Sequence, residues 1–381
     1  MRGTAAEDIK SMNDTIREIL SAYALPGELT EAVPFGSGHI NDTIRLTCMT
    51  QAGPERYVLQ RLNTHIFKDP EGVMRNIVTV TAHLSAKIRA RGGDPLRETL
   101  NVVRNRAGGS FAVAADGGFW RVTRFIEGTV SYDVVEDPAL MYESGRAFGV
   151  FQKDLRDLDA GTLCEVLPDF HNTPLRFEQF TAALEADCRG RAKDCGPEIA
   201  FLLAREPLAS AAETLRRAGT LPLRVTHNDT KINNVMFDAE SAHAVCVIDL
   251  DTVMPGLVLY DFGDAIRTGT NTGEEDEPDT AKIGFATERY EAFTRGFLEQ
   301  SANALTAAEC ETLPLGARLI TYEQSLRFLT DYLAGDTYYK TAYPDHNLVR
   351  ARTQIRLLGE MEKAQARMEQ INAACLARFR E

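Results

Sequence analysis

A short polar segment, followed by an apolar strand and an acidic residue, constrains this chain more than any other feature. The segment reads V-T-H-N-D-T-K-I-N-N and ends at Asn234, and the apolar run Ala244–Ile248 precedes Asp249. Asp229 can accept a proton from a hydroxyl group, while Asn234 and Asp249 offer the oxygen atoms that Mg²⁺ prefers. For phosphoryl transfer a protein must supply a proton acceptor and ligands for the metal ion, and it needs little further covalent chemistry. We therefore expect a phosphotransferase whose catalytic loop opens a β-hairpin that ends at Asp249.

The loop matches the catalytic loop of protein kinases, H-R-D-L-x-x-x-N, at its His, Asp and Asn positions. The sequence H-N-D-T-K-I-N-N keeps their offsets and has asparagine in place of arginine. We predict Asp229 as the catalytic base, Asn234 and Asp249 as metal ligands, and Lys231 as a cation that neutralises charge on the transferred phosphoryl group. A polar turn between strands is the alternative, since Asn, Asp and Thr are common turn residues. The strand and acidic residue that follow favour the catalytic interpretation.

A second acidic motif, Asp261-Phe-Gly263, spells the metal-binding D-F-G of protein kinases. It precedes the apolar pair Ala265-Ile266 and does not end a hairpin, so we expect Asp261 near a helix N-terminus. There its carboxylate can accept backbone N–H bonds and organise the catalytic loop without binding metal. Asp251 shares a face with Asp249 in an extended chain. It is either a ligand of a second metal ion or a hydrogen-bonding loop residue.

Composition excludes several classes of protein. The 381 residues, 44% hydrophobic and 25% charged, suffice for two globular domains. We find no apolar run of about 18 residues and no apolar N-terminal segment, so we expect neither a membrane span nor a signal peptide. Seven scattered cysteines indicate neither a disulfide framework nor a zinc site and fit a reducing cytoplasm. The net charge of −13 argues against nucleic-acid and anionic-membrane partners. We expect a monomer or weak oligomer.

A glycine-rich turn indicates the nucleotide side. Gly36, Ser37 and Gly38 lie between two expected strands, where glycine lets backbone N–H groups approach phosphates. A simple tight hairpin is the alternative. The position of the usual phosphate-pairing lysine, at the end of the third strand, is occupied by Gln60, and strand alternation places Arg61 on the opposite face. Either Arg61, another cation or Mg²⁺ alone must then perform this role.

The order of expected elements is that of a bilobal kinase, an α+β protein-kinase-like fold. We predict a nucleotide-binding lobe with a leading helix over residues 1–127 and a helical lobe with the catalytic loop over 128–381, with Glu127 at the hinge between them. The acidic run 274–277 is expected to be a solvated loop. The apolar spacing predicts strands or hairpins at 43–48, 57–62, 111–113, 119–126, 223–226, 235–237 and 244–249. It predicts helices at 6–24, 70–92, 138–155, 176–190, 197–218, 281–299, 306–336 and 345–379.

Three segments resemble the aminoglycoside phosphotransferase/choline kinase-like superfamily: H-N-D-T-K-x-N-N, I-D-L-D-T-V-M-P-G and Y-D-F-G-D-A-I-R. More narrowly, the chain resembles the N-acetylhexosamine 1-kinases of bifidobacterial type. This resemblance extends through Gly38-His-Ile-Asn41, Phe170-His-Asn-Thr-Pro174, Arg327-Phe-Leu329 and the segment Tyr343–Arg350. In having glutamine at the position of the lysine, the chain also resembles this subgroup.

The resemblance implies transfer of the ATP γ-phosphate to the anomeric hydroxyl of N-acetylglucosamine or N-acetylgalactosamine, with Mg²⁺ as cofactor. The sugar contacts that it implies are His39, Asp229, Arg327 and Tyr338. Two alternatives remain open. One is a kinase of the same fold that acts on an aminoglycoside, choline or homoserine. The other is a nucleotide-binding pseudokinase, which Gln60 supports and the complete set of Asp229, Asn234 and Asp249 opposes.

Overall fold

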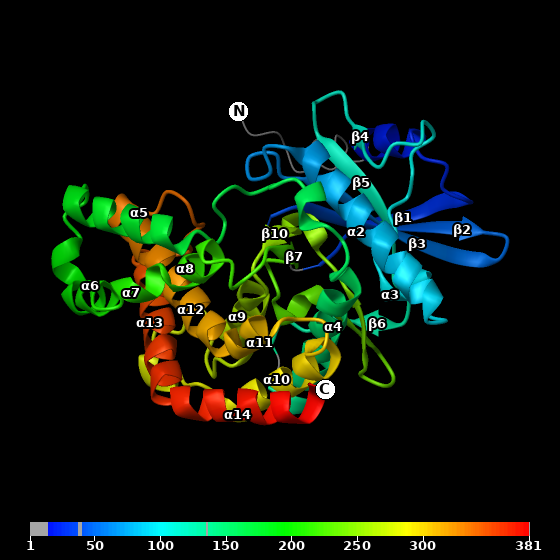
Figure 1. Ribbon diagram of the computed structural model, residues 1–381. Coiled ribbons are helices and arrows are strands. Elements are labelled where there is room, and N and C mark those ends of the chain that lie inside the picture. Colours follow the sequence, from blue (N-terminus) through cyan, green and yellow to red (C-terminus); the bar gives the residue numbers. More distant parts are fainter. Residues whose placement is uncertain (1–13, 37–39, 135, 381) are drawn as a thin grey trace. The chain divides into compact units, whose positions relative to one another are not determined.

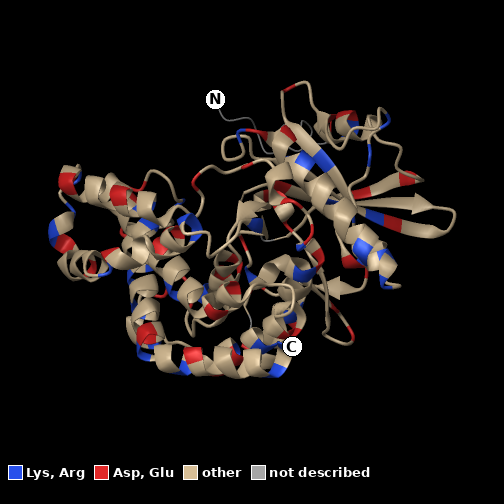
Figure 2. Ribbon diagram, in the orientation of Figure 1, with Lys and Arg blue, Asp and Glu red and all other residues tan. Residues whose placement is uncertain are grey.

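The computed structural model describes residues 14–36, 40–134 and 136–380, and Figure 1 shows its elements. The chain divides into two units, one made of Met1–Thr129 with Leu163–Leu167 and the other of Val130–Thr162 with Pro168–Glu381. Acidic and basic residues are interspersed over the helices of the second unit (Figure 2).

The first unit is built on an antiparallel sheet of order β1-β2-β3-β5-β4. Alternate residues of β2 and β3, such as Leu46 and Leu59, are buried, which is the period-two pattern that predicts a strand. The strands are β1 (Glu28–Pro34), β2 (Asp42–Thr50), β3 (Gly53–Leu62), β4 (Ala112–Val113) and β5 (Phe119–Arg124). Helices α2 (Pro70–Ala90) and α3 (Pro95–Glu98) follow β3. Of the predicted helix 6–24, residues 14–21 are helical and 6–13 lie outside the described residues.

The second unit is mostly helical, with two small sheets of order β6-β8-β9 and β10-β7. Its helices are α4 (Pro138–Leu155), α5 (Thr173–Ala186), α6 (Gly196–Leu203), α7 (Glu206–Ala209), α8 (Ala211–Arg217), α9 (Val258–Gly269), α10 (Thr287–Ser301), α11 (Ala307–Glu311), α12 (Leu313–Ala334), α13 (His346–Lys363) and α14 (Gln365–Phe379). Its strands are β6 (Thr129–Val130), β7 (Arg224–Thr226), β8 (Val235–Asp238), β9 (Ala244–Val247) and β10 (Met254–Gly256). Short 3₁₀ turns are η1 (Ala160–Thr162), η2 (Ala192–Asp194), η3 (Ile232–Asn234), η4 (Leu250–Thr252) and η5 (Thr280–Lys282).

Two predicted helices are interrupted. The predicted helix 197–218 is three helices, and 306–336 is two. Pro207 and Pro314 each stand at the second position of a new helix. Proline cannot donate the backbone hydrogen bond that a continuing helix needs, but it is accommodated in a first turn. Strands β6 and β10 were not predicted, because two or three residues are too few to show a period.

Glycine lets neighbouring helices of the second unit pack closely. A methyl group at Gly263 of α9 would lie 2.3 Å from the carbonyl oxygen of Gly316, and one at Gly316 of α12 would lie 2.1 Å from that of Leu259. At Gly296 of α10 it would lie 2.1 Å from the Tyr142 carbonyl oxygen of α4. Real Cβ atoms do not approach so closely, so these helix pairs depend on glycine.

No helix within the described ranges is long and apolar enough to cross a bilayer. The cysteines that the structure describes form no disulfide with one another.

Candidate active site

The catalytic loop connects β7 to β8, and the hairpin predicted from the sequence is present. Val235 of β8 pairs with Val247 of β9, and the backbone N–H of Ile248 donates to the carbonyl oxygen of Asn234 at 2.8 Å. Asp249 therefore follows the residue opposite Asn234, which brings the two predicted metal ligands to the same end of the hairpin. The backbone of Asp249 is left-handed (φ 57°), a conformation that non-glycine residues adopt at a cost.

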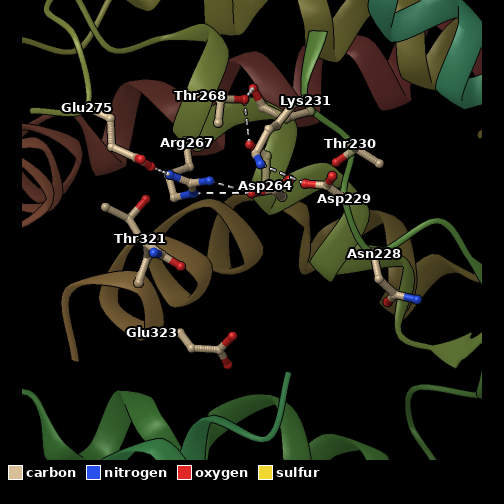
Figure 3. A network of polar contacts seen from close by, with 12 residues as sticks. Asn228, Asp229, Thr230, Lys231, Asp264, Arg267, Thr268, Glu275, Thr321 and Glu323 are labelled. Carbon is tan, nitrogen blue, oxygen red and sulfur yellow. Dashed lines mark hydrogen bonds and ion pairs between the residues drawn. The ribbon is translucent and has the colours of Figure 1, made fainter. Parts of the chain in front are cut away.

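The functional side chains of the loop contact one another. The Asp229 carboxylate lies 3.1 Å from Lys231 Nζ through Oδ1, and its Oδ2 accepts from Asn234 Nδ2 at 3.2 Å (Figure 3 shows the Asp229–Lys231 contact). The same Nδ2 donates to the backbone oxygen of Asp229 at 2.8 Å. Asn234 thus fixes the aspartate through both its backbone and its carboxylate.

The charge of Asp229 follows from these neighbours. Its side chain is 25% exposed. Burial alone would raise its pKa, but the Lys231 ammonium holds the pKa of the carboxyl below its ordinary value. The carboxylate in turn raises the pKa of Lys231. Near neutral pH the pair therefore consists of a carboxylate, able to orient a hydroxyl and accept its proton, and an ammonium.

His227 fixes the loop from inside and is fully buried. Its Nδ1 accepts the backbone N–H of Asp229 at 3.3 Å, and its Nε2 lies 2.9 Å from the carbonyl oxygen of Ile248. The ring proton therefore resides on Nε2. The edges of Phe148 and Phe151 on α4 enclose the ring. His227 thus links the backbone of the base to the residue before Asp249.

Asp261 has the organising role predicted for it. It lies in the first turn of α9 and is 1% exposed. Its Oδ2 accepts the N–H of His227 at 2.9 Å and Gln152 Nε2 at 2.7 Å, and its Oδ1 accepts the N–H of Asn228 at 2.7 Å. Burial raises the pKa of Asp261, and the hydrogen bonds oppose that effect only in part. The carboxylate thus binds the backbone of the catalytic loop.

A row of alternating charges extends from Lys231 into the protein, as Figure 3 shows. Arg267 Nη2 donates to Asp264 Oδ1 at 2.9 Å, and Arg267 Nη1 donates to Glu275 Oε1 at 3.0 Å. Asp264 and Arg267 are each 5% exposed, and Asp264 also raises the pKa of Lys231. The run 274–277 lies in a loop, as predicted, and Glu275 is 46% exposed, but the Arg267 guanidinium holds its carboxylate. The sequence gives no sign of this, since Arg267 and Glu275 stand on different elements.

Asn234 and Asp249 suit a magnesium ion by their chemistry. Both hydrogen bonds of the Asn234 amide described above use Nδ2, so Oδ1 is the atom that can bind a cation. An amide oxygen and a carboxylate are hard oxygen donors, and Mg²⁺ characteristically takes one or two protein ligands and completes its shell with water and phosphate. Among the residues that the structure describes, no cluster of three or more His, Cys, Asp and Glu side chains forms a metal cage. The donor set fits Mg²⁺ and does not fit zinc.

Two of the predicted acceptor contacts lie together. The Arg327 guanidinium of α12 faces three aromatic rings, 5.6 Å from the centroid of Phe170, 6.0 Å from Tyr338 and 5.7 Å from Tyr339. Tyr338 is 69% exposed. Its backbone N–H donates to Asp331 Oδ1 at 2.8 Å, so a carboxylate on α12 holds the segment in place. His39, another of the four predicted contacts, lies outside the described residues.

On the nucleotide side, Gly36 is left-handed (φ 84°) with open space where a side chain would project, while Ser37 and Gly38 lie outside the described residues. The Glu127 carboxylate pairs with Arg56 at 2.8 Å. The backbone carbonyl of Glu127 accepts from Arg97 at 2.8 Å. Glu127 is therefore anchored within the first unit through both its side chain and its backbone.

The structure brings a cation to Gln60 that the sequence does not identify. Arg121 of β5 stands opposite Gln60 of β3, and its Nε and Nη2 donate to Gln60 Oε1 at 3.0 and 2.9 Å. Arg121 is 4% exposed. Arg61, by contrast, pairs with Asp116 at 3.0 Å and stacks over Trp120. Strand pairing could not be read from the sequence, so the partner of Gln60 was not identifiable.

The sequence matches the model of a family described as the phosphotransferase enzyme family over residues 31–298, more than half of the chain, and the chain belongs to this family. Similar solved structures include a microcompartment-associated aminopropanol kinase, with 14% identity, a TM-score of 0.51 and coverage of 95% of this chain and 98% of that one. An aminoglycoside phosphotransferase from Alicyclobacillus acidocaldarius has 14% identity, a TM-score of 0.54 and coverage of 96% and 95%. Spectinomycin phosphotransferase with ADP and spectinomycin has 11% identity, a TM-score of 0.54 and coverage of 93% and 98%. These likenesses confirm the predicted α+β kinase-like fold.

Proposed function

We propose that this protein is an ATP-dependent kinase that phosphorylates the anomeric hydroxyl of N-acetylhexosamines and releases the sugar 1-phosphate. The proposal rests on one observation: Asp229, Lys231 and Asn234 contact one another in a chain of the phosphotransferase enzyme family. The resemblance to N-acetylhexosamine 1-kinases supplies the identity of the acceptor.

In this mechanism the Asp229 carboxylate accepts a hydrogen bond from the sugar hydroxyl and takes its proton late in the transfer. An anomeric hydroxyl is more acidic than an ordinary alcohol, and the loose transition state asks little of the base. Lys231 holds the carboxylate and adds positive charge where the phosphoryl group moves. Asn234 and Asp249 would hold Mg²⁺, which supplies the charge that balances the phosphates.

The surroundings of Arg327 support a neutral acceptor. Aromatic rings arranged around a cation are a typical site for a quaternary ammonium ligand. Here the rings of Phe170, Tyr338 and Tyr339 already surround the guanidinium of the protein. An amine-bearing acceptor would meet a like charge, whereas a sugar can accept hydrogen bonds from Arg327 and stack its apolar face on the exposed Tyr338.

An amine-bearing acceptor remains the second candidate, because the names of the similar structures include aminopropanol and aminoglycoside kinases. A polycationic acceptor favours an acidic rim, and the run 274–277 is the part of the sequence that suggested one. Three of its carboxylates are already paired: Glu275 with Arg267 at 3.0 Å, Asp276 with His346 at 2.9 Å and Glu277 with Lys282 at 3.2 Å. This pairing weakens the second candidate.

We assign to Arg121 the role of the missing phosphate-pairing lysine. It shares a strand face with Gln60, which binds it through a neutral amide. Arg121→Gln should raise the KM for ATP about tenfold or more, because a charge-assisted contact is lost. The double variant Gln60→Lys/Arg121→Gln returns a cation to the same face and should restore much of the loss. An unchanged KM in Arg121→Gln would refute the assignment.

An acceptor panel tests the proposed function. Mg-ATP turnover is measured with N-acetylglucosamine, N-acetylgalactosamine, galactose, kanamycin, choline and homoserine, and phosphorus NMR identifies the product. An anomeric phosphate from the N-acetyl sugars supports the proposal. Phosphate on an amine-bearing acceptor keeps the kinase chemistry and rejects the sugar. ATP binding without transfer to any acceptor favours a pseudokinase.

Asp229→Ala tests the role of the base. The variant should lose about 10²–10⁴-fold in kcat, while its KM for ATP stays within about threefold of wild type. Asp279→Ala is the control, since this exposed carboxylate accepts one backbone N–H in η5. Equal losses in ATP binding and turnover would contradict the role of Asp229.

A further inference from the structure

His171 contacts the catalytic loop from the segment before α5. Its Nε2 lies 3.2 Å from the backbone oxygen of Asn228, and its Nδ1 lies 2.9 Å from Oε1 of Glu323 on α12. The side chains of His171 and Glu323 are 7% and 2% exposed. Carbonyl and carboxylate oxygens only accept hydrogen bonds, so both ring nitrogens must bear a proton for both contacts to form. The geometry is therefore that of an imidazolium.

The groups around the ring favour this charge. Burial acts to lower the pKa of His171, but Glu323 and, more weakly, Asp264 of α9 raise it above its ordinary value. Thr173 donates to the second oxygen of Glu323 at 2.6 Å, which keeps that carboxylate ionised and in place. The ring of Tyr260, also on α9, lies with its centroid 5.0 Å from that of the imidazole. Burial raises the pKa of Tyr260, so this ring stays neutral.

The carbonyl that His171 holds belongs to the peptide joining Asn228 to the catalytic base Asp229. Asn228 is left-handed (φ 65°), a conformation that costs about 1–2 kcal/mol for a residue with a Cβ. On one side of this residue its N–H donates to the carboxylate of Asp261, and on the other its carbonyl accepts from the imidazolium. An anion therefore holds the donor and a cation holds the acceptor. Rotation of this peptide would turn the Asp229 carboxylate away from Lys231.

We propose that His171 is a positioning residue for phosphoryl transfer. Its protonated ring holds the Asn228–Asp229 peptide in the catalytic orientation, and Glu323 keeps the ring protonated at neutral pH. The inference rests on the proposed phosphotransferase function, because it concerns the orientation of the base. It follows that turnover depends on the charge of the His171 ring. Turnover is full while the ring is protonated and falls as the pH rises through the pKa of the ring.

The test compares pH profiles of kcat from pH 6 to 9.5 for wild type, Glu323→Gln and His171→Gln, with the best acceptor from the panel. Wild type should show a descending alkaline limb with a midpoint above the ordinary histidine value of about 6.5. Glu323→Gln keeps an acceptor for Nδ1 but removes the charge, so the midpoint should fall by about one pH unit or more. His171→Gln can still donate one hydrogen bond to Asn228. It should show a kcat about tenfold lower without this limb, at an unchanged KM for ATP.

A role limited to stability predicts a different outcome. In that case both variants would lower the melting temperature and kcat at every pH, but leave the midpoint of the limb where it is in wild type. That result would overturn the proposal. Melting temperatures at pH 6 and 8 confirm that each variant is folded in the range of the assay.

Failure of the proposed function would be visible separately. If no acceptor is turned over, ¹³C-labelled histidine in the intact protein is titrated by NMR, and the signal missing from His171→Gln identifies the ring of His171. A ring pKa above about 6.5 that falls in Glu323→Gln supports the protonated pair. A ring that is already neutral at pH 6 refutes the proposal whatever the acceptor.

Discussion

Removal of the Arg267 guanidinium should destabilise the protein more than the loss of an ordinary ion pair. In Arg267→Leu, the buried Asp264 carboxylate loses two hydrogen bonds to Oδ1, at 3.2 and 2.9 Å. Its Oδ2 already has no hydrogen-bond partner within the described part of the chain. A buried charge whose partner is removed costs about 3–5 kcal/mol of the free energy of unfolding. Because Lys231 is one of the cations that still interact with Asp264 in this variant, we expect Lys231 to turn from Asp229 and kcat to fall as well.

Urea unfolding followed by circular dichroism at 222 nm, where the helices of the second unit dominate, measures this loss. Glu275→Gln is the matched control, because it removes the other partner of Arg267 at a position that is 46% exposed. Exposed pairs contribute about 0–1 kcal/mol, so the control should stay near wild type. The double variant Asp264→Asn/Arg267→Leu removes both buried charges and should recover most of the stability. A loss of less than about 1 kcal/mol in Arg267→Leu, or a double variant no better than the single one, would refute this reasoning.

Two further variants test the catalytic loop and the helix packing. Asp261→Asn should lower kcat about tenfold or more and the free energy of unfolding by about 1–3 kcal/mol, because a buried backbone N–H of the loop loses its acceptor. Turnover and urea unfolding measured on the same preparation check both effects, and a kcat near that of wild type would contradict the organising role of Asp261. Gly296→Ala should destabilise the protein by about 1–3 kcal/mol, since the new methyl group overlaps the Tyr142 carbonyl. Gly196→Ala is the control, because its methyl group meets open space and should leave stability unchanged. Thermal unfolding of both glycine variants measures the difference.

The sequence was sufficient for the fold and for the position of the hairpin that carries the predicted catalytic residues. The apolar periodicity predicted both ends of α4 correctly. The motifs predicted the positions of the loop, of the strand Ala244–Val247 and of the helix that contains Asp261. These features are local, because each depends on neighbours within about ten residues. Local chemistry also distinguished the true hairpin from the D-F-G motif at Asp261.

The partners of those residues were not predictable in the same way. Arg121 beside Gln60 and His171 beside the loop are contacts between elements distant in sequence, and the charge of Asp264 acts on Lys231 from another such element. The apolar periodicity of a strand or helix predicts which of its faces is buried. It does not predict which other element packs against that face. The acidic run at 274–277 shows the consequence, since its charges predict an exposed loop but not the partners of Glu275 and Asp276, which are Arg267 on α9 and His346 on α13.

The distinction between local motif and distant partner has a physical basis in the catalytic loop itself. The loop contains buried backbone polar groups and a left-handed residue, Asn228, and buried N–H and C=O groups must find partners. The residues of the motif include the proposed reacting groups. The partners of the loop backbone are supplied or aligned by Gln152 on α4, by Asp261 on α9 and by His171 together with Glu323 on α12. The positions of α9 and α12 depend in turn on close packing at glycines. The geometry of the base is therefore a property of helix packing, and substitutions that separate these helices should lower kcat without touching any residue of the motif.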